Sequence, residues 1–457
     1  MSEIDFQFRD KTVCVLGLGY VGLTLAATLA DVGFKVLGIE IRDDVLRMLQ
    51  DGAPHFYEPG LKEKLGRVVR NGNLEFYKKI PKGNSATVYI ITVGTPLGTT
   101  GHARLDMIEN ISAEIATHLK EGDLVIVRST VMLGTTRRVV KGLLDKAGVK
   151  YDLAFCPERT VEGQALRELR ELPQIVGGLN FESTVRAAQF FQMTTPTVVR
   201  VDNMETAEMI KMVDNVQRDV GFAFSNEVAR MCDAAGISAL QVISAGKLGY
   251  PRTNLPLPGL VGGPCLEKDT HIFAEGMSRY GVVPEVSLKA RRLNENQPME
   301  VVTGLRAITD SIQGFATRPT ITLMGIAFKG RPVTDDLRGT MARPVFAALK
   351  EKFPDATFRG FDPVVSKTEI QAFGLNPCET IERGFEGSDL VVILNNHPLF
   401  SSMPVENMAG AMNKPGLIYD FWNNFVAKSL HLPNGVGYLA LGSHGQGILP
   451  DLKGASR

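Results

Sequence analysis

The sequence has no net charge and no long apolar run, and each of these absences excludes a class of protein. Fifty basic residues balance fifty acidic ones, which argues against nucleic acid or an anionic membrane as the main partner. No apolar segment reaches the length that spans a bilayer, and residues 1–5 lack the apolar core of a secretory signal. We therefore expect a soluble, cytoplasmic protein that binds neither nucleic acid nor membrane.

Cysteine is also scarce, and its five positions are far apart: Cys14, Cys156, Cys232, Cys265 and Cys378. An odd number of scattered cysteines without metal-ligand spacing favours reduced thiols over a disulfide framework, and we expect no bound metal. The 457 residues are too many for one ordinary core, and 44% of them are hydrophobic. A globular protein of two or three domains is expected.

Short apolar runs alternate with helical segments in the first and last thirds of the chain. This alternation predicts an α/β fold with two doubly wound, Rossmann-like domains. Residues 204–235 have helical periodicity without proline, so we expect one long central helix that joins the two domains. The predicted domains are 1–200, 201–310 and 311–457. The individual predictions are strands at 12–16, 35–39, 87–93, 124–127, 152–155, 320–326, 357–361 and 390–394, and helices at 23–32, 204–235, 286–296 and 342–352.

A glycine-rich turn follows the first predicted strand and opens a helix. Gly17, Gly19 and Gly22 have the spacing at which a turn tightens, the backbone nears a pyrophosphate, and the helix packs on the strand. Glu40 ends the next strand, where its carboxylate could bind the ribose hydroxyls and repel a 2′-phosphate. We therefore expect NAD rather than NADP. The candidate cofactor-binding residues of this turn are Gly17, Gly19, Tyr20, Val21 and Gly22.

Two threonines follow later strands of the same domain. Ligands of doubly wound sheets lie beyond the carboxyl ends of the strands, so Thr95 and Thr130 are placed to line the cofactor crevice. Taken singly, each threonine is as readily a turn or cap residue.

Segment 262–269 carries Cys265 in a loop bounded by glycine and proline, with Lys268 and Asp269 shortly after it. A thiolate is a strong nucleophile, and nearby positive charge favours it at neutral pH. An oxidoreductase that takes an alcohol to an acid can use such a thiol to capture the intermediate aldehyde. The alternative is a small buried hydrophobic residue, the usual role of a cysteine without a disulfide.

Two further pairs of polar residues have alternative interpretations. Lys211 and Asn215 share one face of the predicted long helix and could stabilise an oxyanion, although an exposed Lys211 paired with Glu208 is the simpler interpretation. Glu158 and Glu162 could shuttle protons, but carboxylates in a loop are more often only solvated.

The joint order of these segments resembles the UDP-glucose/GDP-mannose dehydrogenase family, over about residues 11–420. Members oxidise the C6 alcohol of a nucleotide sugar to a carboxylate with NAD. The segments that carry the resemblance are 17–22, 55–61, 95–96, 129–130, 157–158, 207–215, 226–227, 262–269, 328–329 and 336–338.

The resemblance implies a role for each matching residue. Cys265 would form the thioester, Lys211 and Asn215 would stabilise oxyanions, Asp269 and Thr130 would position water, and Glu162 would assist proton transfer. Residues 256–263 would wrap the substrate pyrophosphate, and Lys329 and Arg338 would help to bind the nucleotide sugar or close the cofactor site. The implied cofactor-binding residues are those of the glycine turn with Glu40, Thr95, Thr130 and Lys329, and the implied substrate-binding residues are Glu158, Arg159, Lys211, Pro256, Gly259, Gly262 and Arg338.

By the same resemblance the first domain would bind NAD, the central one would dimerise and carry the active site, and the last would bind a UDP-sugar. The product would be a UDP-uronic acid for polysaccharide or glycan synthesis, made by a homodimer or larger homo-oligomer.

Two places depart from the family pattern: Glu267 stands where a proline is common, and residues 420–424 lack an arginine that contacts substrate. The substrate signal is mixed, because residues 156–159 are similar to the UDP-N-acetylhexosamine branch and residues 268–269 to the UDP-glucose branch. Two alternative functions stay open. One is a two-electron hydroxyacid-type dehydrogenase with a structural cysteine, and the other is a non-catalytic NAD-binding regulator.

Overall fold

The computed structural model describes residues 8–99 and 101–452. Residues 1–5, in which we predict no secretory signal, lie outside the described residues. The chain forms two compact units, Met1–Asn215 with Lys268–Pro284 and Val216–Glu267 with Glu285–Arg457. The three-domain division at 1–200, 201–310 and 311–457 stays a prediction.

The first unit is built on an eight-stranded sheet with the order β3-β2-β1-β4-β5-β6-β7-β8. The first six strands follow the order of a dinucleotide-binding fold. In this fold the order in which strands are added across the sheet reverses between β1 and β4. The central strands are buried along almost their whole length because helices cover both faces of the sheet, and nearly all of their residues are apolar. The strands are β1 (Thr12–Leu16), β2 (Lys35–Ile39), β3 (Leu74–Tyr77), β4 (Val88–Ile91), β5 (Asp123–Val127), β6 (Tyr151–Phe155), β7 (Gln174–Gly178) and β8 (Val198–Val201).

All neighbouring strands of this sheet pair in parallel except β6 and β7. In the central pair, Val13 of β1 lies opposite Val88 of β4. Two buried clusters form the core, and they draw on alternate residues of β1, Val13 and Val15 in one and Cys14 and Leu16 in the other. The helices are α1 (Tyr20–Val32), α2 (Asp43–Gln50), α3 (Leu61–Arg70), α4 (Asp106–Ala116), α5 (Lys141–Leu144), α6 (Ala165–Glu171) and α7 (Phe181–Gln192).

The second unit repeats this strand order in a six-stranded parallel sheet, β11-β10-β9-β12-β13-β14. Two Rossmann-like domains are therefore confirmed. Its strands are β9 (Thr320–Met324), β10 (Thr357–Phe361), β11 (Asn376–Pro377), β12 (Leu390–Ile393), β13 (Gly416–Asp420) and β14 (Val436–Ala440), and its helices are α12 (Ala342–Lys352), α13 (Lys367–Phe373), α14 (Ile381–Phe385), α15 (Pro398–Ser402) and α16 (Val405–Ala409).

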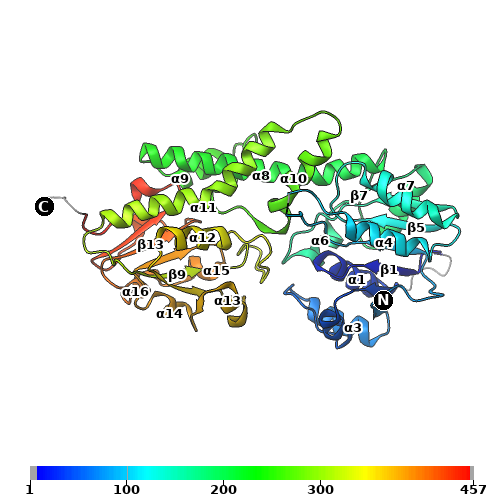
Figure 1. The fold of residues 1–457 in the computed structure, drawn as a ribbon, viewed down its shortest axis with the longest axis horizontal. Coiled ribbons are helices and arrows are strands. Elements are labelled where there is room, and N and C mark those ends of the chain that lie inside the picture. Colours follow the sequence, from blue (N-terminus) through cyan, green and yellow to red (C-terminus); the bar gives the residue numbers. More distant parts are fainter. Residues whose placement is uncertain (1–7, 100, 453–457) are drawn as a thin grey trace. The chain divides into compact units, whose positions relative to one another are not determined.

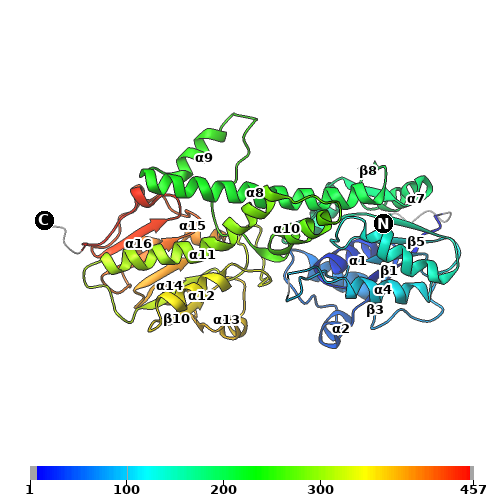
Figure 2. The same cartoon turned by 45° about the horizontal axis from the view of Figure 1, so that its top comes forward.

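The predicted long helix is confirmed as α8 (Met204–Ala235), one uninterrupted helix that joins the two units (Figures 1 and 2). It is followed by Gly236, whose φ of 70° is a conformation that glycine adopts without strain. The remaining helices are α9 (Ala239–Lys247), α10 (Gly263–Ser278) and α11 (Glu285–Ser311). The prediction of a helix over 286–296 was too short, because α11 continues through Pro298 and buries Val302 and Leu305 beyond it. Packing of this later face offsets the hydrogen bond that the proline cannot make.

Candidate active site

The turn after β1 has the shape that a bound pyrophosphate requires. Gly17 has φ 94°, which disfavours any residue with a side chain. A Cβ at Gly22 would lie 1.9 Å from the carbonyl oxygen of Gly17, so only glycine lets α1 begin this close to the strand. Tyr20 and Val21 open α1 directly after this turn. The N-terminus of α1 is thereby brought to the switch point of the sheet, where it suits a dinucleotide phosphate.

Glu40 lies at the end of β2, as predicted, and it is buried. Its Oε1 accepts a hydrogen bond of 3.0 Å from the backbone N–H of Arg42, and the Arg42 Nε lies 3.7 Å away. These contacts hold a carboxylate beside the glycine turn, where ribose hydroxyls of NAD would find an acceptor. The residues of the first unit therefore fit this cofactor.

Thr95 and Thr130 are brought together, although they follow different strands. The Thr95 Oγ1 donates to the Thr130 carbonyl oxygen at 2.5 Å, and the Ser129 Oγ donates to the Val93 carbonyl at 2.6 Å. The hydroxyl of Thr95 is thus committed to tying the two strand ends together. Thr130 takes part in this bond through its backbone carbonyl, not through its side chain.

The loop after β6 carries both predicted carboxylates, but they have different surroundings. Glu158 is buried against the guanidinium of Arg128, and its Oε1 accepts the backbone N–H groups of Arg159 and Thr160 at 2.8 Å each. Burial alone would raise the pKa of Glu158, but the Arg128 charge holds that pKa below its usual value. Glu158 therefore shapes the loop, while Arg159 pairs with Asp214 at 3.0 Å.

Glu162 lies in a segment that is fastened to the cofactor turn. The backbone N–H of Gly163 donates to the Tyr20 hydroxyl at 2.6 Å and to the Glu58 Oε2 at 2.7 Å. The Tyr20 hydroxyl also donates to the Glu58 carboxylate. One buried carboxylate thus joins the first turn of α1 to the loop that bears Glu162.

On α8, the interpretation of Lys211 as an exposed residue paired with Glu208 is wrong. Lys211 is only 8% exposed. The Glu208 carboxylate instead accepts the backbone N–H groups of Gly134 and Thr136, and burial raises its pKa. Asn215 lies one turn further along the same face of α8 and is also buried.

Asn215 is hydrogen-bonded to the segment that follows Cys265 in the sequence. Its Nδ2 donates to the Asp269 Oδ2 at 2.6 Å, and the Lys268 Nζ lies 2.8 Å from the Asp269 Oδ1. Asp269 is 1% exposed. A buried carboxylate with an amide on one oxygen and an ammonium on the other is rigidly held, which suits a group that orients water.

Cys265 lies in the first turn of α10 rather than in a loop, which corrects the sequence interpretation. The helix begins at Gly263 and includes Pro264, a residue that the first turn of a helix tolerates because its missing N–H has no partner there. Cys265 is exposed, whereas the other four cysteines are buried. The interpretation of Cys265 as a buried hydrophobic residue is therefore wrong.

The loop before α10 is held by α8 and by loops of the second unit that contain Gly339 and Trp422. The Ser225 Oγ donates to the Pro256 carbonyl at 2.6 Å, and the indole ring of Trp422 packs against Gly259, where a Cβ would lie 2.8 Å from it. A Cβ at Gly262 would lie 2.3 Å from the Gly339 carbonyl oxygen. Trp422 thus occupies the region in which the family resemblance implied an arginine.

In the second unit, the turn after β9 differs from the cofactor turn after β1. Asp362 follows β10 as Glu40 follows β2, but its Oδ2 accepts the N–H groups of Ile326 and Ala327 at 2.7 and 3.0 Å. This carboxylate stabilises its own turn. The domain therefore has no glycine fingerprint and no acid directed at a ribose, which fits a ligand other than NAD.

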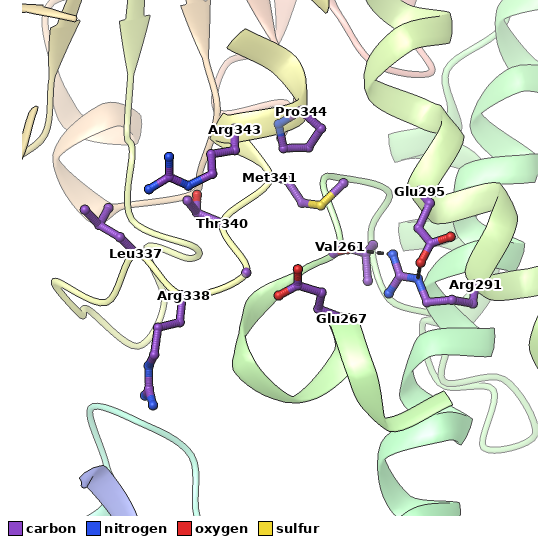
Figure 3. A pocket seen from close by; sticks show the side chains of 11 residues that line it. Val261, Glu267, Arg291, Glu295, Leu337, Arg338, Thr340, Met341, Arg343 and Pro344 are labelled. Atoms are coloured by element: carbon purple, nitrogen blue, oxygen red, sulfur yellow. Dashed lines mark hydrogen bonds and ion pairs between the residues drawn. The ribbon is translucent and has the colours of Figure 1, made fainter. Parts of the chain in front are cut away.

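A cavity of about 650 Å³ lies within the second unit (Figure 3). Arg338 lines it and pairs with Asp336, and Glu267 and Arg343 also line it. Lys329 is not among the lining residues; its ammonium lies 5.1 Å from the ring centroid of Phe328. The backbone N–H of Phe328 donates to the Asp336 carbonyl at 3.0 Å, so the segments that carry these two basic residues are joined.

Across residues 8–99 and 101–452, no group of three or more His, Cys, Asp or Glu side chains is arranged to hold a metal ion. Within the same ranges no helix combines the length and the apolar character needed to cross a bilayer.

The fold and site define an NAD-dependent oxidoreductase with a second nucleotide-binding domain, and comparison with known proteins specifies the family. Residues 11–195 match the NAD binding domain of the UDP-glucose/GDP-mannose dehydrogenase family, residues 205–296 its central domain, and residues 322–427 its UDP binding domain. The chain belongs to this family and is an NAD-dependent nucleotide-sugar dehydrogenase.

Several relatives are described as UDP-N-acetyl-D-mannosamine dehydrogenases. The one from Methanococcus aeolicus is 32% identical over 91% of this chain and 92% of its own length. The one from Campylobacter jejuni is 34% identical over 74% of this chain and 83% of its own length. A solved structure of UDP-D-ManNAc dehydrogenase from Pyrococcus horikoshii superposes with a TM-score of 0.84, at 28% identity, covering 95% of this chain and all of that one.

Sequence reasoning missed three buried pairings of polar residues around these sites. They are Tyr20 with Glu58, Arg128 with Glu158, and Arg291 with Asp219. Each pairing joins segments far apart in sequence, so no local spacing could have paired them.

Proposed function

We propose that the protein oxidises the C6 alcohol of a UDP-N-acetylhexosamine, of the N-acetylmannosamine class, to the uronic acid in two two-electron steps. The observation that carries this proposal is the first half of α10. It presents an exposed thiol at Cys265 and, one turn later, a buried carboxylate at Asp269 that is hydrogen-bonded to Asn215. A two-electron dehydrogenase has no use for such a thiol.

NAD, held by the glycine turn and Glu40, would accept the hydride in each oxidation. The first oxidation breaks the C6–H and O–H bonds of the alcohol and leaves an aldehyde. The Cys265 sulfur then bonds to the aldehyde carbon, and its proton goes to the oxygen, which gives a thiohemiacetal. Loss of a second hydride and the hydroxyl proton leaves a thioester on Cys265.

Water, oriented by Asp269 and Thr130, would then add to the thioester carbon. The carbon–sulfur bond breaks, the acid leaves, and the thiol regains a proton. Lys211 and Asn215 would stabilise the oxyanion of each tetrahedral species, because buried donors directed at a developing charge cost no reorganisation. Glu162 would relay protons from the loop fastened to Tyr20.

The second nucleotide domain would hold the UDP moiety. Lys329 and Arg338 would supply charges that suit a diphosphate, and the loop that contains Pro256, Gly259 and Gly262 would contact it. Arg159 and Glu158 would shape the sugar end of the site. Trp422 replaces a charged contact with an aromatic surface, so the sugar contacts there would be less electrostatic.

The relatives described as UDP-N-acetyl-D-mannosamine dehydrogenases support the N-acetylhexosamine branch over UDP-glucose. Kinetics on UDP-N-acetylmannosamine, UDP-N-acetylglucosamine, UDP-glucose and GDP-mannose test this. We expect kcat/KM to be highest for an N-acetylhexosamine, by at least about tenfold, since a site with buried polar groups built for an amide discriminates strongly against a sugar that lacks it. Robust activity on UDP-glucose alone would contradict the branch, and activity confined to GDP-mannose would contradict the UDP assignment.

We also propose that the enzyme is a homodimer or larger homo-oligomer formed through α8. Val213, Phe224 and Met231 are 48%, 53% and 53% exposed, and their spacings of about three and two helical turns place them on one face. Phe224→Asp should shift the sedimentation coefficient to that of a smaller species, because it charges the centre of this face. A monomeric parent protein would contradict the proposal. The prediction of a cytoplasmic location rests on the scattered cysteines and stays a prediction.

A further inference from the structure

The backbone around Cys265 is fastened by two buried side chains of the second unit. Asn226 of α8 makes two hydrogen bonds to Gly259, accepting from its N–H at 2.9 Å and donating to its carbonyl at 3.1 Å. Arg291 of α11 donates from Nη2 to the Val261 carbonyl at 3.0 Å and from Nη1 to the Leu266 carbonyl at 3.0 Å. Figure 3 shows the guanidinium directed at Val261. Arg291 therefore bridges the loop before Cys265 and the residue directly after it.

The charge of Arg291 is balanced inside the protein. Its side chain is 1% exposed, and Nη1 lies 2.9 Å from the Oδ1 of the buried Asp219. The Asn294 side-chain amide donates to the Asp219 backbone carbonyl at 3.0 Å and to the Asp219 Oδ1 at 2.8 Å. The Asn294 Oδ1 accepts from the Asn226 side chain at 3.0 Å. One connected network thus runs from Asp219 through both clamping residues to the loop.

Stability alone does not account for this arrangement. Taking two charges out of water carries a large desolvation cost, and apolar residues of similar volume often serve a core as well. What a guanidinium supplies is a planar set of donors in fixed directions, which can serve two carbonyls and a carboxylate at once. A lysine ammonium is a single point of charge and cannot span the same three acceptors.

We propose that Arg291 is a positioning residue that fixes the Cys265 thiol for capture of the aldehyde. Val261 is four residues before Cys265 and Leu266 is the next residue after it, so joining their carbonyls sets the direction in which α10 leaves the loop. That direction determines where the thiol points. The proposal rests on the proposed function, because it assigns Arg291 to the step that needs the thiol. The first oxidation needs no thiol, so loss of Arg291 affects the two oxidations differently.

Arg291→Lys tests this. We expect the variant to keep its thermal unfolding transition and NAD binding, and to carry out the first oxidation within about threefold of the parent rate. Conversion of the aldehyde to the acid should fall on the order of 10²-fold, the effect of a displacement of about 1 Å at a reacting group. The yield should drop from two NADH per sugar toward one, with free aldehyde trapped by a hydrazine reagent. The alkylation rate of Cys265 by iodoacetamide should also change severalfold.

Arg359→Lys is the matched control. Arg359 lies on β10 of the same unit, where it donates to Thr322, to Ser388 and to the Glu386 carbonyl. The same chemical change there should leave two NADH per sugar and no free aldehyde. Any general weakening of the second unit by an arginine-to-lysine change would appear in both variants.

Two results with a folded Arg291→Lys would overturn the proposal. One is two NADH per sugar with no free aldehyde at the parent rate. The other is equal slowing of both oxidations, which would make Arg291 purely structural. If Arg291→Lys fails to fold, Arg291→Met combined with Asp219→Asn removes both charges together and is judged by the same outcomes. One NADH per sugar from the parent protein would instead overturn the proposed function, and the assignment of Arg291 with it.

Discussion

Cys265→Ala is expected to abolish formation of the uronic acid while leaving NAD binding intact. The sulfur is the only atom of that residue that can bond to the aldehyde carbon, and loss of a covalent nucleophile costs on the order of 10³-fold or more in turnover. The first oxidation does not involve the sulfur and should continue. Rapid-quench analysis of the sugar products, with NADH followed by absorbance, separates the two oxidations.

Cys378→Ala provides the control for this prediction, because Cys378 is buried in the second unit and has no part in the proposed chemistry. It should keep a yield of two NADH per sugar. Acid formation by Cys265→Ala at a rate near that of the parent would show that the thiol is not the nucleophile. The two-electron alternative with a structural cysteine would then be favoured.

Lys211→Met is expected to lower kcat for acid formation by about 10²–10³-fold, with a smaller effect on KM. The side chain is buried at 8% exposure, and removal of one preorganised donor to an oxyanion has costs of this size. Methionine keeps the length and apolar character of the lysine stem, so packing on α8 should persist. Steady-state kinetics together with NAD titration check both expectations.

Lys289→Met is the matched control, since Lys289 is exposed on α11 and pairs only loosely with Glu285 at 3.6 Å. Its kinetics should equal those of the parent. A rise in KM alone for Lys211→Met, with kcat unchanged, would mean that Lys211 binds the substrate and its transition state equally well. It would then have no role as an oxyanion donor.

The sequence predicted most of what depends on local pattern. Strand 12–16, strand 35–39 and helix 204–235 agree with the structure residue for residue. Glycines mark their boundaries, because Gly17 follows the first strand, Gly33 lies just before the second, and Gly236 follows the helix. The glycine turn and the acid at the end of the next strand were recognisable for the same reason.

What the sequence could not supply depends on contacts between distant segments. The burial of Lys211 follows from tertiary packing, since Glu208 is engaged by the backbone of residues 134 and 136 rather than by the lysine one turn away. Gly263 and Pro264 predict a loop at the start of α10 because both usually interrupt helices, but both are compatible with a first turn. The role of Glu158 likewise depends on Arg128, thirty residues earlier in the chain.

The most direct test of the account is the stoichiometry of the parent enzyme. A limiting amount of UDP-N-acetylmannosamine, or of whichever UDP-sugar the kinetic panel selects, is consumed to completion with excess NAD, and NADH and sugar products are counted together. The account predicts two NADH and one uronic acid for each sugar consumed. One NADH for each sugar, with an aldehyde or ketone released, would contradict it.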